Sequence, residues 1–350
     1  MRKPRLTGKA QTVLGLIPAE ELGITLPHEH LLIAIPRNFV EPTAVTEKAL
    51  AHQPVSMENL HWVRYHYGSN LDNLILMDEK VAIDEALRFK WLGGKTIIDF
   101  TNIGLGRDPL ALRRISLATG LNIIMGSGYY VGPSHPPDIA KKNEEEIAEE
   151  IARDITIGVG DTGIRAGIIG EIGTSWPLMD NERKVLRAAA IAQRRTSTSV
   201  NVHPGRNARA PFDIIKLLSD AGGDIARTVM SHLDRTLRDL DDLLKLAKTG
   251  CYIEYDLCGW EGYYPLLKTI DLPIDAQRVT EIKELIAEGY VNQILISQDI
   301  CQKADLYCFG GRSYCHILER MVPLMRDKGI SEEHIDTILV GNAKRLLQFA

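Results

Sequence analysis

The chain has 350 residues, of which 45% are hydrophobic and 25% charged, and its formal net charge is -5. These values are typical of a water-soluble globular protein, and there is no basic excess that would attract nucleic acid or an anionic membrane. The N-terminal stretch lacks the apolar segment of a signal peptide, and no stretch reaches the roughly 18 apolar residues of a membrane span. We therefore expect a cytoplasmic protein whose partners include neither nucleic acid nor a membrane.

Strand-like and helix-like segments alternate along the chain. The first strand is expected in ITLPHEHLLI, residues 24–33. From residue 79 onward, amphipathic helical stretches, in most cases ended by a glycine, alternate with short runs of strand-forming residues. These runs are 93–101, 119–128, 162–172, 199–204, 222–232, 249–256 and 288–299. Glycine suits the left-handed residue that ends a helix, and the alternation is typical of parallel βαβ units.

Eight strands that alternate with helices predict a (β/α)8 TIM barrel, and one barrel domain over residues 1–350 fits the length. A doubly wound open sheet is the alternative, but no G-x-G-x-x-G turn follows the first strand. Segments 34–78 and 257–277 are too long for plain connections, and we expect them to be loops over the active-site mouth. The aromatic residues of the second loop, which include Trp260, could cover a substrate or pack against a neighbouring subunit.

Residues able to bind metal recur at the C-terminal ends of the predicted strands. His28 and His30 are one residue apart in LPHEH, so on a strand they would project from the same side as a chelating pair. By the same alternation, His203 should face the barrel axis while Val200 and Val202 face the helices. A lone strand-end histidine is more often structural, but six such residues at matching positions favour a metal centre. The six are His28, His30, Glu171, His203, His232 and Asp299.

Four imidazoles and two carboxylates exceed the needs of one tetrahedral ion, which predicts two divalent metals. Glu171 is the expected bridge; the histidine pair of the first strand and Asp299 would hold one metal, and His203 and His232 the other. Zinc is the first choice, with manganese, cobalt or iron as alternatives. A bridging hydroxide would attack the substrate, and Asp299 is the expected general base. No nucleophile elbow or P-loop competes with this hydrolytic chemistry.

The metal-ligand pattern resembles the amidohydrolase superfamily and, within it, the phosphotriesterase family. The nearest subgroup is that of phosphotriesterase-related proteins, through LPHEHLLI, AGIIGEIGTSWPL, VHPGRN, VMSHLDRT, IEYDLCG and ILVGNAKRLL. The resemblance runs nearly end to end and implies a (β/α)8 barrel, a binuclear metal site and a homodimer. Phosphotriesterase itself has a carboxylated lysine where this chain has Glu171, and its proton-relay aspartate and histidine correspond to Arg235 and Leu257. These departures argue against efficient triesterase chemistry.

Arginines and aromatic residues near the strand ends are candidates for substrate binding. Arg206 and Arg235 follow the fifth- and sixth-strand histidines and could bind an anionic group. Alternatively, each could pair with a neighbouring acid, such as Asp234 or Asp256, and brace the metal ligands. Tyr130 and Trp176, like Trp260, could form pocket walls or pack in the barrel.

We therefore expect hydrolysis of a carboxylic ester, a lactone or an N-acyl amide of a small anionic molecule, with phosphotriesters as a promiscuous side activity. One alternative is that organophosphate triesters are the main substrates. The other is a barrel that keeps its metals but binds a ligand without catalysis. Turnover that requires metal and vanishes in Asp299→Asn would separate an enzyme from a binding protein.

Overall fold

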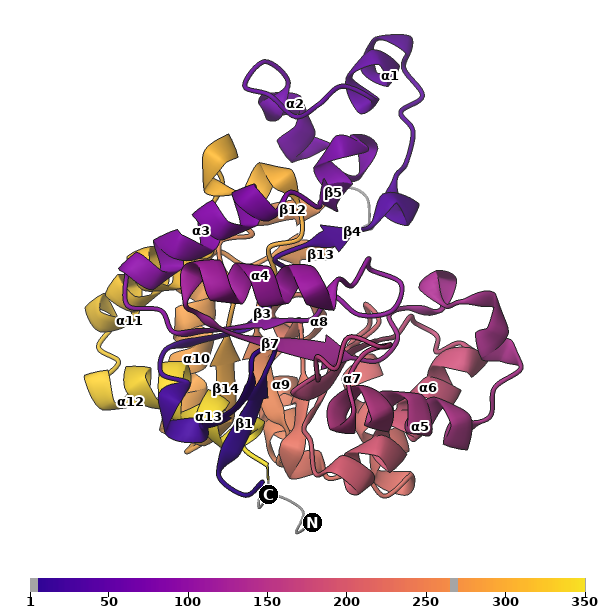
Figure 1. Ribbon diagram of the computed structural model, residues 1–350. Helices are drawn as coiled ribbons and strands as arrows, with labels where there is room; N and C mark the ends of the chain where they lie inside the picture. The colour runs from indigo at the N-terminus through magenta and orange to yellow at the C-terminus, as the bar shows by residue number, and fades with distance from the viewer. Residues whose placement is uncertain (1–5, 265–269, 350) are drawn as a thin grey trace.

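Eight parallel strands form a nearly closed barrel surrounded by helices in the computed structural model, which describes residues 6–264 and 270–349 (Figure 1). The order of the strands around the barrel is the reverse of their order in the chain. In that order they are β14 (Ile294–Ile296), β11 (Tyr252–Tyr255), β10 (Thr228–Met230), β9 (Val200–His203), β8 (Ile168–Gly173), β7 (Asn122–Ser127), β6 (Thr96–Asp99) and β3 (Thr25–Glu29).

The two end strands of this order, β14 and β3, lie side by side and bring the sheet to near closure. The backbone N–H of Asp299, just after β14, donates to the carbonyl oxygen of His28 at 3.3 Å. The N–H of His28 donates in turn to Ser297 Oγ at 3.1 Å. An open sheet would leave both strands as edges. The predicted (β/α)8 barrel is thus confirmed, and the doubly wound alternative is wrong.

Helices connect successive strands and cover the outside of the barrel. Several begin at side-chain caps that the sequence provides: the Asp78 carboxylate accepts the backbone N–H groups of Lys80 and Val81, and Asn143 and Glu146 form a capping box. The helices are α1 (Val45–Ala51), α2 (Leu60–Tyr65), α3 (Glu79–Trp91), α4 (Pro109–Thr119), α5 (Glu144–Thr156), α6 (Asp180–Thr196), α7 (Ala210–Asp220), α8 (Leu233–Thr236), α9 (Leu240–Ala247), α10 (Asp275–Ala287), α11 (Val322–Asp327), α12 (Glu332–Asp336) and α13 (Asn342–Leu347).

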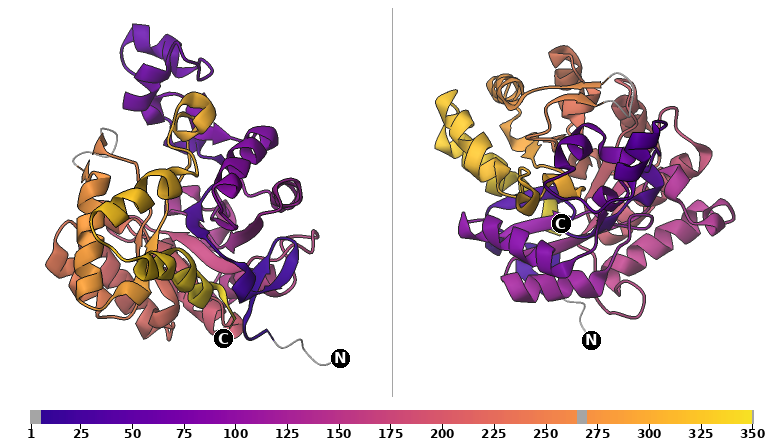
Figure 2. Two further views of the ribbon diagram at one scale, coloured as in Figure 1. Left: turned by 90° about the vertical axis from the view of Figure 1, so that its left-hand side faces the viewer. Right: turned by 90° about the horizontal axis from the view of Figure 1, so that it is seen from above.

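The N-terminal end of the barrel is covered by the two ends of the chain. The antiparallel hairpin of β1 (Lys9–Thr12) and β2 (Gly15–Pro18) lies there with α13, and the N–H of Phe349 donates to the carbonyl oxygen of Lys9 at 2.9 Å. Figure 2 shows both termini at this end and α1 and α2 at the opposite end. The C-terminal ends of the strands therefore open away from the termini.

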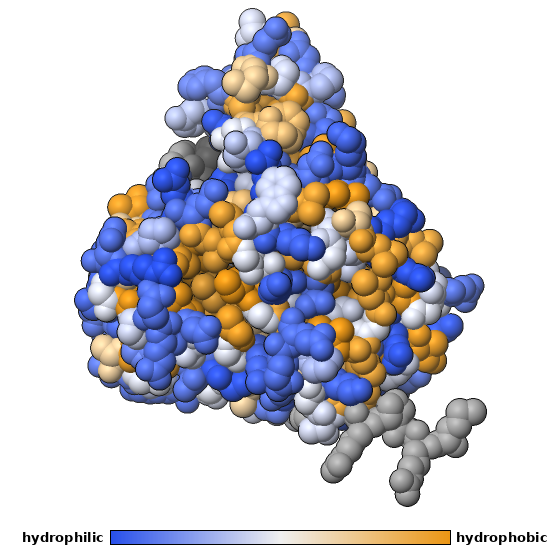
Figure 3. Space-filling model, turned by 60° about the vertical axis from the view of Figure 1, so that its left-hand side comes forward, coloured by the Kyte–Doolittle hydropathy of each residue, from blue (hydrophilic) through white to orange (hydrophobic). Residues whose placement is uncertain are grey.

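Residues 34–78, which we predicted to be a long loop over the active-site mouth, form a protrusion above the barrel that contains two short α-helices. The protrusion contains α1 and α2 and ends at a short antiparallel pair, β4 (Ile33–Ala34) and β5 (Ile75–Leu76). Its base is joined to the segment after β14, because Lys303 forms an ion pair with Asp72 at 2.6 Å. Apolar side chains appear on its surface in Figure 3, and Val45 and Met57 are among the exposed ones.

The second predicted loop, 257–277, contains a short hairpin, β12 (Gly262–Tyr264) paired with β13 (Ile270–Leu272). It is shorter than predicted because α10 begins at Asp275, and residues 265–269 lie outside the described part of the chain. Across the described residues, no helix has both the length and the apolar character needed to cross a membrane.

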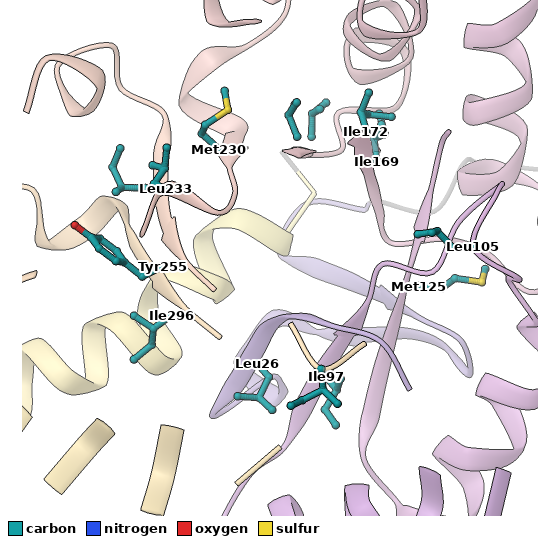
Figure 4. Close-up of a cluster of buried hydrophobic side chains, with 14 of the residues drawn as sticks. Leu26, Ile97, Leu105, Met125, Ile169, Ile172, Met230, Leu233, Tyr255 and Ile296 are labelled. Atoms are coloured by element: carbon teal, nitrogen blue, oxygen red, sulfur yellow. The ribbon is translucent and has the colours of Figure 1, made fainter. Parts of the chain in front are cut away.

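The strands separate an outer hydrophobic cluster from an inner one. Val200 and Val202 belong to the outer cluster, which lies between the strands and the helices. Figure 4 shows part of this cluster, including Leu26 and Ile296. Leu295 belongs to the inner cluster, which fills the lower barrel together with the hairpin and α13. Burial of each such side chain contributes about 1.5–3 kcal/mol. The predicted sidedness of these strands is confirmed, so the polar residues at their C-terminal ends face the barrel mouth.

Candidate metal centre and substrate pocket

The six predicted metal ligands converge at the C-terminal mouth of the barrel, around Glu171 on β8. Glu171 Oε2 lies 3.0 Å from His203 Nδ1, 3.5 Å from His232 Nε2 and 3.6 Å from His28 Nε2. Its other oxygen, Oε1, lies 3.6 Å from His30 Nε2. One carboxylate therefore approaches all four imidazoles. His28 and His30 lie on the β3 side of the mouth, and His203 and His232 lie on the side of β9 and β10.

Asp299 completes the set on the β3 side. Its Oδ1 lies 3.3 Å from His30 Nε2 and 3.9 Å from His28 Nε2, and these three residues form a group whose ligand atoms all lie within 4.8 Å of one another. On the other side, His232 Nε2 lies 2.8 Å from His203 Nδ1. The arrangement thus has two overlapping groups of nitrogen and oxygen atoms, with the Glu171 carboxylate between them.

Unusual backbone geometry positions three of these residues. His232 (φ 52°) and Asp299 (φ 51°) have left-handed backbones, a conformation that costs energy for residues other than glycine and clusters at functional sites. Gly170, directly before Glu171, has a φ of 129°, and a Cβ there would lie 2.5 Å from the carbonyl oxygen of Asn201. Only glycine lets β8 pass this close to β9 and deliver Glu171 to the centre.

Buried polar groups hold the imidazoles from behind. Asp256 Oδ1 lies 2.7 Å from His232 Nδ1, and its Oδ2 lies 3.1 Å from His28 Nδ1. Glu254 Oε2 is also 3.2 Å from His28 Nδ1, and Thr101 Oγ1 is 2.9 Å from His30 Nδ1. Such partners fix ring orientation, so that the opposite nitrogens face Glu171 and Asp299.

The direct contact of Glu254 and Asp256 with the imidazoles was missed in the sequence, where Asp256 was considered only as a partner of the arginines, although a signal for the contact was present. Both residues lie in the predicted strand IEYD, two positions apart, so alternation places both side chains on one face. A pair of acids at the end of the seventh strand, beside strands that carry histidines, could have been interpreted as a brace for the imidazoles.

The carboxylates give the centre a negative field. Burial by itself lowers the pKa of His232, but the Asp256 and Glu171 carboxylates together outweigh it and the pKa rises to about 9. The same balance raises the pKa of His28 well above its usual value. Burial raises the pKa of Glu171, but His203 and the other imidazoles bring it well below the usual range. A field that favours protonated imidazoles also favours bound cations.

The donor set fits divalent metal ions. His28 Nε2 is buried and has no hydrogen-bond partner among the described residues, although the Glu171 and Asp299 carboxylates face it. A buried nitrogen without a partner costs free energy. Imidazole nitrogens with carboxylate oxygens are ligands that zinc and related ions accept, so a cation between these groups would satisfy the nitrogen.

A pocket of about 700 Å³ opens directly above the ligand cluster. Residues of the protrusion and of the loops after β11 and β14 contribute to its wall. Tyr67 and Asn38 come from the protrusion and were missed in the sequence, where no spacing links them to the strand ends. Beside five of the six predicted ligands, the pocket is lined by Ile33, Ile35, Asn38, Tyr67, Leu105, Tyr130, Arg206, Arg235, Leu257, Trp260, Leu272 and Cys301.

The two predicted arginines both line this pocket. Arg235 is 7% exposed; its Nη2 lies 3.1 Å from His203 Nε2, and its Nη1 has no hydrogen-bond partner among the described residues. The alternative pairing with an acid is not seen for Arg235 in the described part of the chain. Asp234 pairs with Arg278 at 2.8 Å, and Asp256 pairs with His232 and His28. Burial and the neighbouring Arg235 lower the pKa of Arg206 to about 10. Both guanidinium groups remain cationic at neutral pH, because arginine is not deprotonated in proteins.

Of the three predicted aromatic residues, two line the pocket and one does not. The Tyr130 ring lies edge-on to His203, with the centroids 5.1 Å apart. Trp260 lines the opposite side of the pocket. The prediction for Trp176 needs correction: it lines a neighbouring groove, with Pro133 among its walls, that shares Tyr130 with the pocket. His203 also lines this groove, so the groove with Trp176 reaches one edge of the ligand cluster.

Similarity to known proteins agrees with this geometry. The sequence profile of the Phosphotriesterase family matches residues 8–347. The chain belongs to the phosphotriesterase family. An N-acetyltaurine hydrolase from Tetraodon nigroviridis is 44% identical over 98% of this chain and 99% of its own length. The family resemblance is thereby confirmed, and the chain is a hydrolase.

Two solved protein structures are similar to this chain over nearly its whole length. A resiniferatoxin-binding protein from Rhodobacter sphaeroides has a TM-score of 0.94 and 34% identity, covering 97% of this chain and 95% of its own. A substituted variant of a PTE-like lactonase from Deinococcus radiodurans has a TM-score of 0.76 and 27% identity, covering 97% and 99%. The barrel of this family thus occurs in proteins named for hydrolysis and in one named for ligand binding.

Proposed function

We propose that this phosphotriesterase-family hydrolase is a binuclear metal-dependent amidase for small N-acyl amino sulfonates or carboxylates, with N-acetyltaurine as the first substrate to test. The observation that carries the proposal is the placement of Arg206 and Arg235 in the pocket above the ligand cluster. Two cations beside a hydrolytic centre suit a substrate with an anionic end. The relative named N-acetyltaurine hydrolase, which matches almost the whole chain, supports a sulfonate at that end.

The six converging side chains would hold two divalent cations, with Glu171 between them; zinc is the first choice, and manganese, cobalt and iron are alternatives. When bound, such cations supply Lewis acidity toward the amide oxygen and lower the pKa of a coordinated water. The chain's own residues supply the orientation of the substrate and the transfer of protons.

Substrate orientation follows from the two sides of the pocket. Arg206 and Arg235, after β9 and β10, would bind the anionic end through charge-assisted hydrogen bonds. Ile33 and Leu105, after β3 and β6, provide an apolar surface on the other side for the acyl group. The amide bond then lies above the ligand cluster, and fixing it there lowers the entropic part of the barrier.

Asp299 is the proposed general base. It lines the pocket, and its side chain is 15% exposed, whereas that of Glu171 is 3% exposed. Its carboxylate can accept a proton from the attacking water and return it to the departing amine. Burial raises its pKa, but His30 and the other imidazoles lower it below the usual range, so the carboxylate is ionised and able to accept.

The test is a metal-dependent activity panel. Metal-depleted protein is loaded with zinc or manganese and assayed on N-acetyltaurine, an N-acetyl amino acid, a neutral lactone and a phosphotriester. We expect turnover of the anionic amides that requires metal and falls about 10²–10⁴-fold in Asp299→Asn. A phosphotriester cleaved far faster than every amide and lactone would replace this proposal with the triesterase alternative.

A second candidate is ligand binding without turnover. It is favoured by the similarity to a protein named for binding resiniferatoxin and by the apolar share of the pocket wall. Tight binding of a panel compound with no product, at full metal occupancy, would support it over the enzyme. A small-molecule partner, a homodimer and a cytoplasmic location stay predictions; sedimentation of the purified protein would test the dimer.

A further inference from the structure

Arg278 on α10 is the largest completely buried side chain in the described part of the chain. It belongs neither to the ligand cluster nor to the pocket lining. Its Nε donates to Asp234 Oδ2 at 2.8 Å, its Nη1 to Asp275 Oδ1 at 2.9 Å, and its Nη2 to the carbonyl oxygen of Trp260 at 2.7 Å. One guanidinium thus joins its own helix α10, which carries Asp275, to α8 and to the loop at Trp260.

Each of these segments supports part of the substrate pocket. Asp234 directly precedes Arg235 on α8, and its Oδ2 also accepts the N–H of Leu257 at 3.2 Å. Asp275 Oδ1 accepts the N–H of Gly259 at 2.9 Å. The Asp234 and Asp275 carboxylates therefore anchor the loop from Leu257 to Trp260, and Arg278 links the two carboxylates to each other.

Trp260 is also held through its ring. The Arg312 guanidinium lies 4.2 Å from the ring centroid, and Tyr67 of the protrusion meets the ring edge-on at 5.8 Å. The Trp260 ring thus contacts Tyr67 of the protrusion and Arg312 of the segment after β14. The hydrogen bond from Arg278 to the Trp260 carbonyl oxygen fixes the backbone that carries this ring.

We propose that Arg278 is a positioning residue for substrate recognition: it fixes the aromatic wall at Trp260 relative to the cationic wall at Arg235. A buried ion-pair cluster gives little net stability, because desolvation offsets the attraction, so the geometry that the cluster imposes is its main contribution. Lysine cannot replace this guanidinium, since a single ammonium cannot reach three acceptors in one plane. The identity of the substrate rests on the proposed function, whereas the positioning does not.

The test compares Arg278→Lys with Arg326→Lys, a matched change at an exposed arginine that pairs with Glu332 on the outside of the barrel. For N-acetyltaurine we expect Arg278→Lys to raise KM at least about tenfold, because small displacements of binding groups cost this much or more, with kcat and metal content unchanged. In a Trp260→Ala background, which removes the aromatic wall, the same substitution should add little further rise in KM. Arg326→Lys should change neither constant.

A second readout needs no substrate. Acrylamide quenching of tryptophan fluorescence, compared with and without Trp260→Phe, isolates Trp260, and we expect its quenching to increase in Arg278→Lys but not in Arg326→Lys. If the wild type does not cleave N-acetyltaurine, the proposed function fails while this measurement still decides the inference. Unchanged Trp260 quenching, or a loss of kcat and metal together, would overturn it. If Arg278→Lys does not fold, Asp275→Asn replaces it. This variant keeps Arg278 but weakens one of its hydrogen bonds, and KM and Trp260 quenching then test the inference.

Discussion

The ligand cluster and the pocket wall share the barrel mouth but come from different parts of the chain. The cluster consists of side chains at strand ends, where neighbouring strands and buried acids such as Asp256 hold them. The wall is contributed largely by the protrusion and by two loops, which reach the pocket through Tyr67, Trp260 and Cys301. Loops vary more easily than strand ends. We infer that reaction chemistry and substrate choice are separable, so changes to the cluster should affect metal binding and kcat, and changes to the wall should affect KM.

Glu171→Ala should have the largest effect. The Glu171 carboxylate approaches all four imidazoles, so without it the paired site should be lost and kcat should fall by about 10³-fold or more. Metal content by elemental analysis and kcat on the best panel substrate measure the two effects. Two tightly bound metals per chain in this variant would contradict the assignment of Glu171 as the bridge.

Asp256→Asn should weaken the cluster without removing a ligand. The amide cannot accept from both His232 and His28, so ring orientation loosens and metal affinity should fall about 10–100-fold. KM should stay near the wild-type value once metal is saturating. Competition with a fluorescent chelator gives the affinity, and Asp154→Asn, at a carboxylate that pairs with Arg107 at 2.7 Å, is the control. Equal metal affinity in both variants would show that Asp256 does not orient the imidazoles.

The cluster could be predicted because strand alternation is a local rule. His28, His30 and His203 follow from it, and Glu254 and Asp256 could have followed in the same way. The left-handed backbones of His232 and Asp299 could not, since this conformation is uncommon outside glycine even for aspartate and histidine, and nothing in the sequence marks which of these residues adopts it.

The wall could not be predicted in the same way. In the protrusion, α1 has 7 residues and α2 has 6, too few for a helical period to emerge from the sequence. Its docking depends on contacts between distant residues, such as Asn73 Nδ2 donating to Gln302 Oε1 at 3.1 Å. Such contacts help to bring Tyr67 to the pocket.

Arg206→Ala tests whether a residue of the pocket wall affects substrate binding without affecting the ligand cluster. Loss of charge-assisted hydrogen bonds to a sulfonate or carboxylate should raise KM for N-acetyltaurine about 10–100-fold, while KM for a neutral lactone changes little. Steady-state kinetics on both substrates separate these effects, and metal content serves as the control. Arg235→Ala would not separate substrate binding from metal binding, because Arg235 also contacts His203. An equal rise in KM on both substrates would make Arg206 structural.

Trp176→Ala should have the smallest effect. Trp176 lines the outer groove and not the pocket, so a substrate as short as N-acetyltaurine, bound between the arginines and the ligand cluster, should not reach it. KM should then stay within about twofold of wild type, as for a substitution remote from the site. Because the groove and the pocket share Tyr130 and Arg206, a longer anionic end could extend from one into the other. A rise in KM as large as that in Arg206→Ala would mean that the substrate occupies both, and the wall would then include the loop after β8.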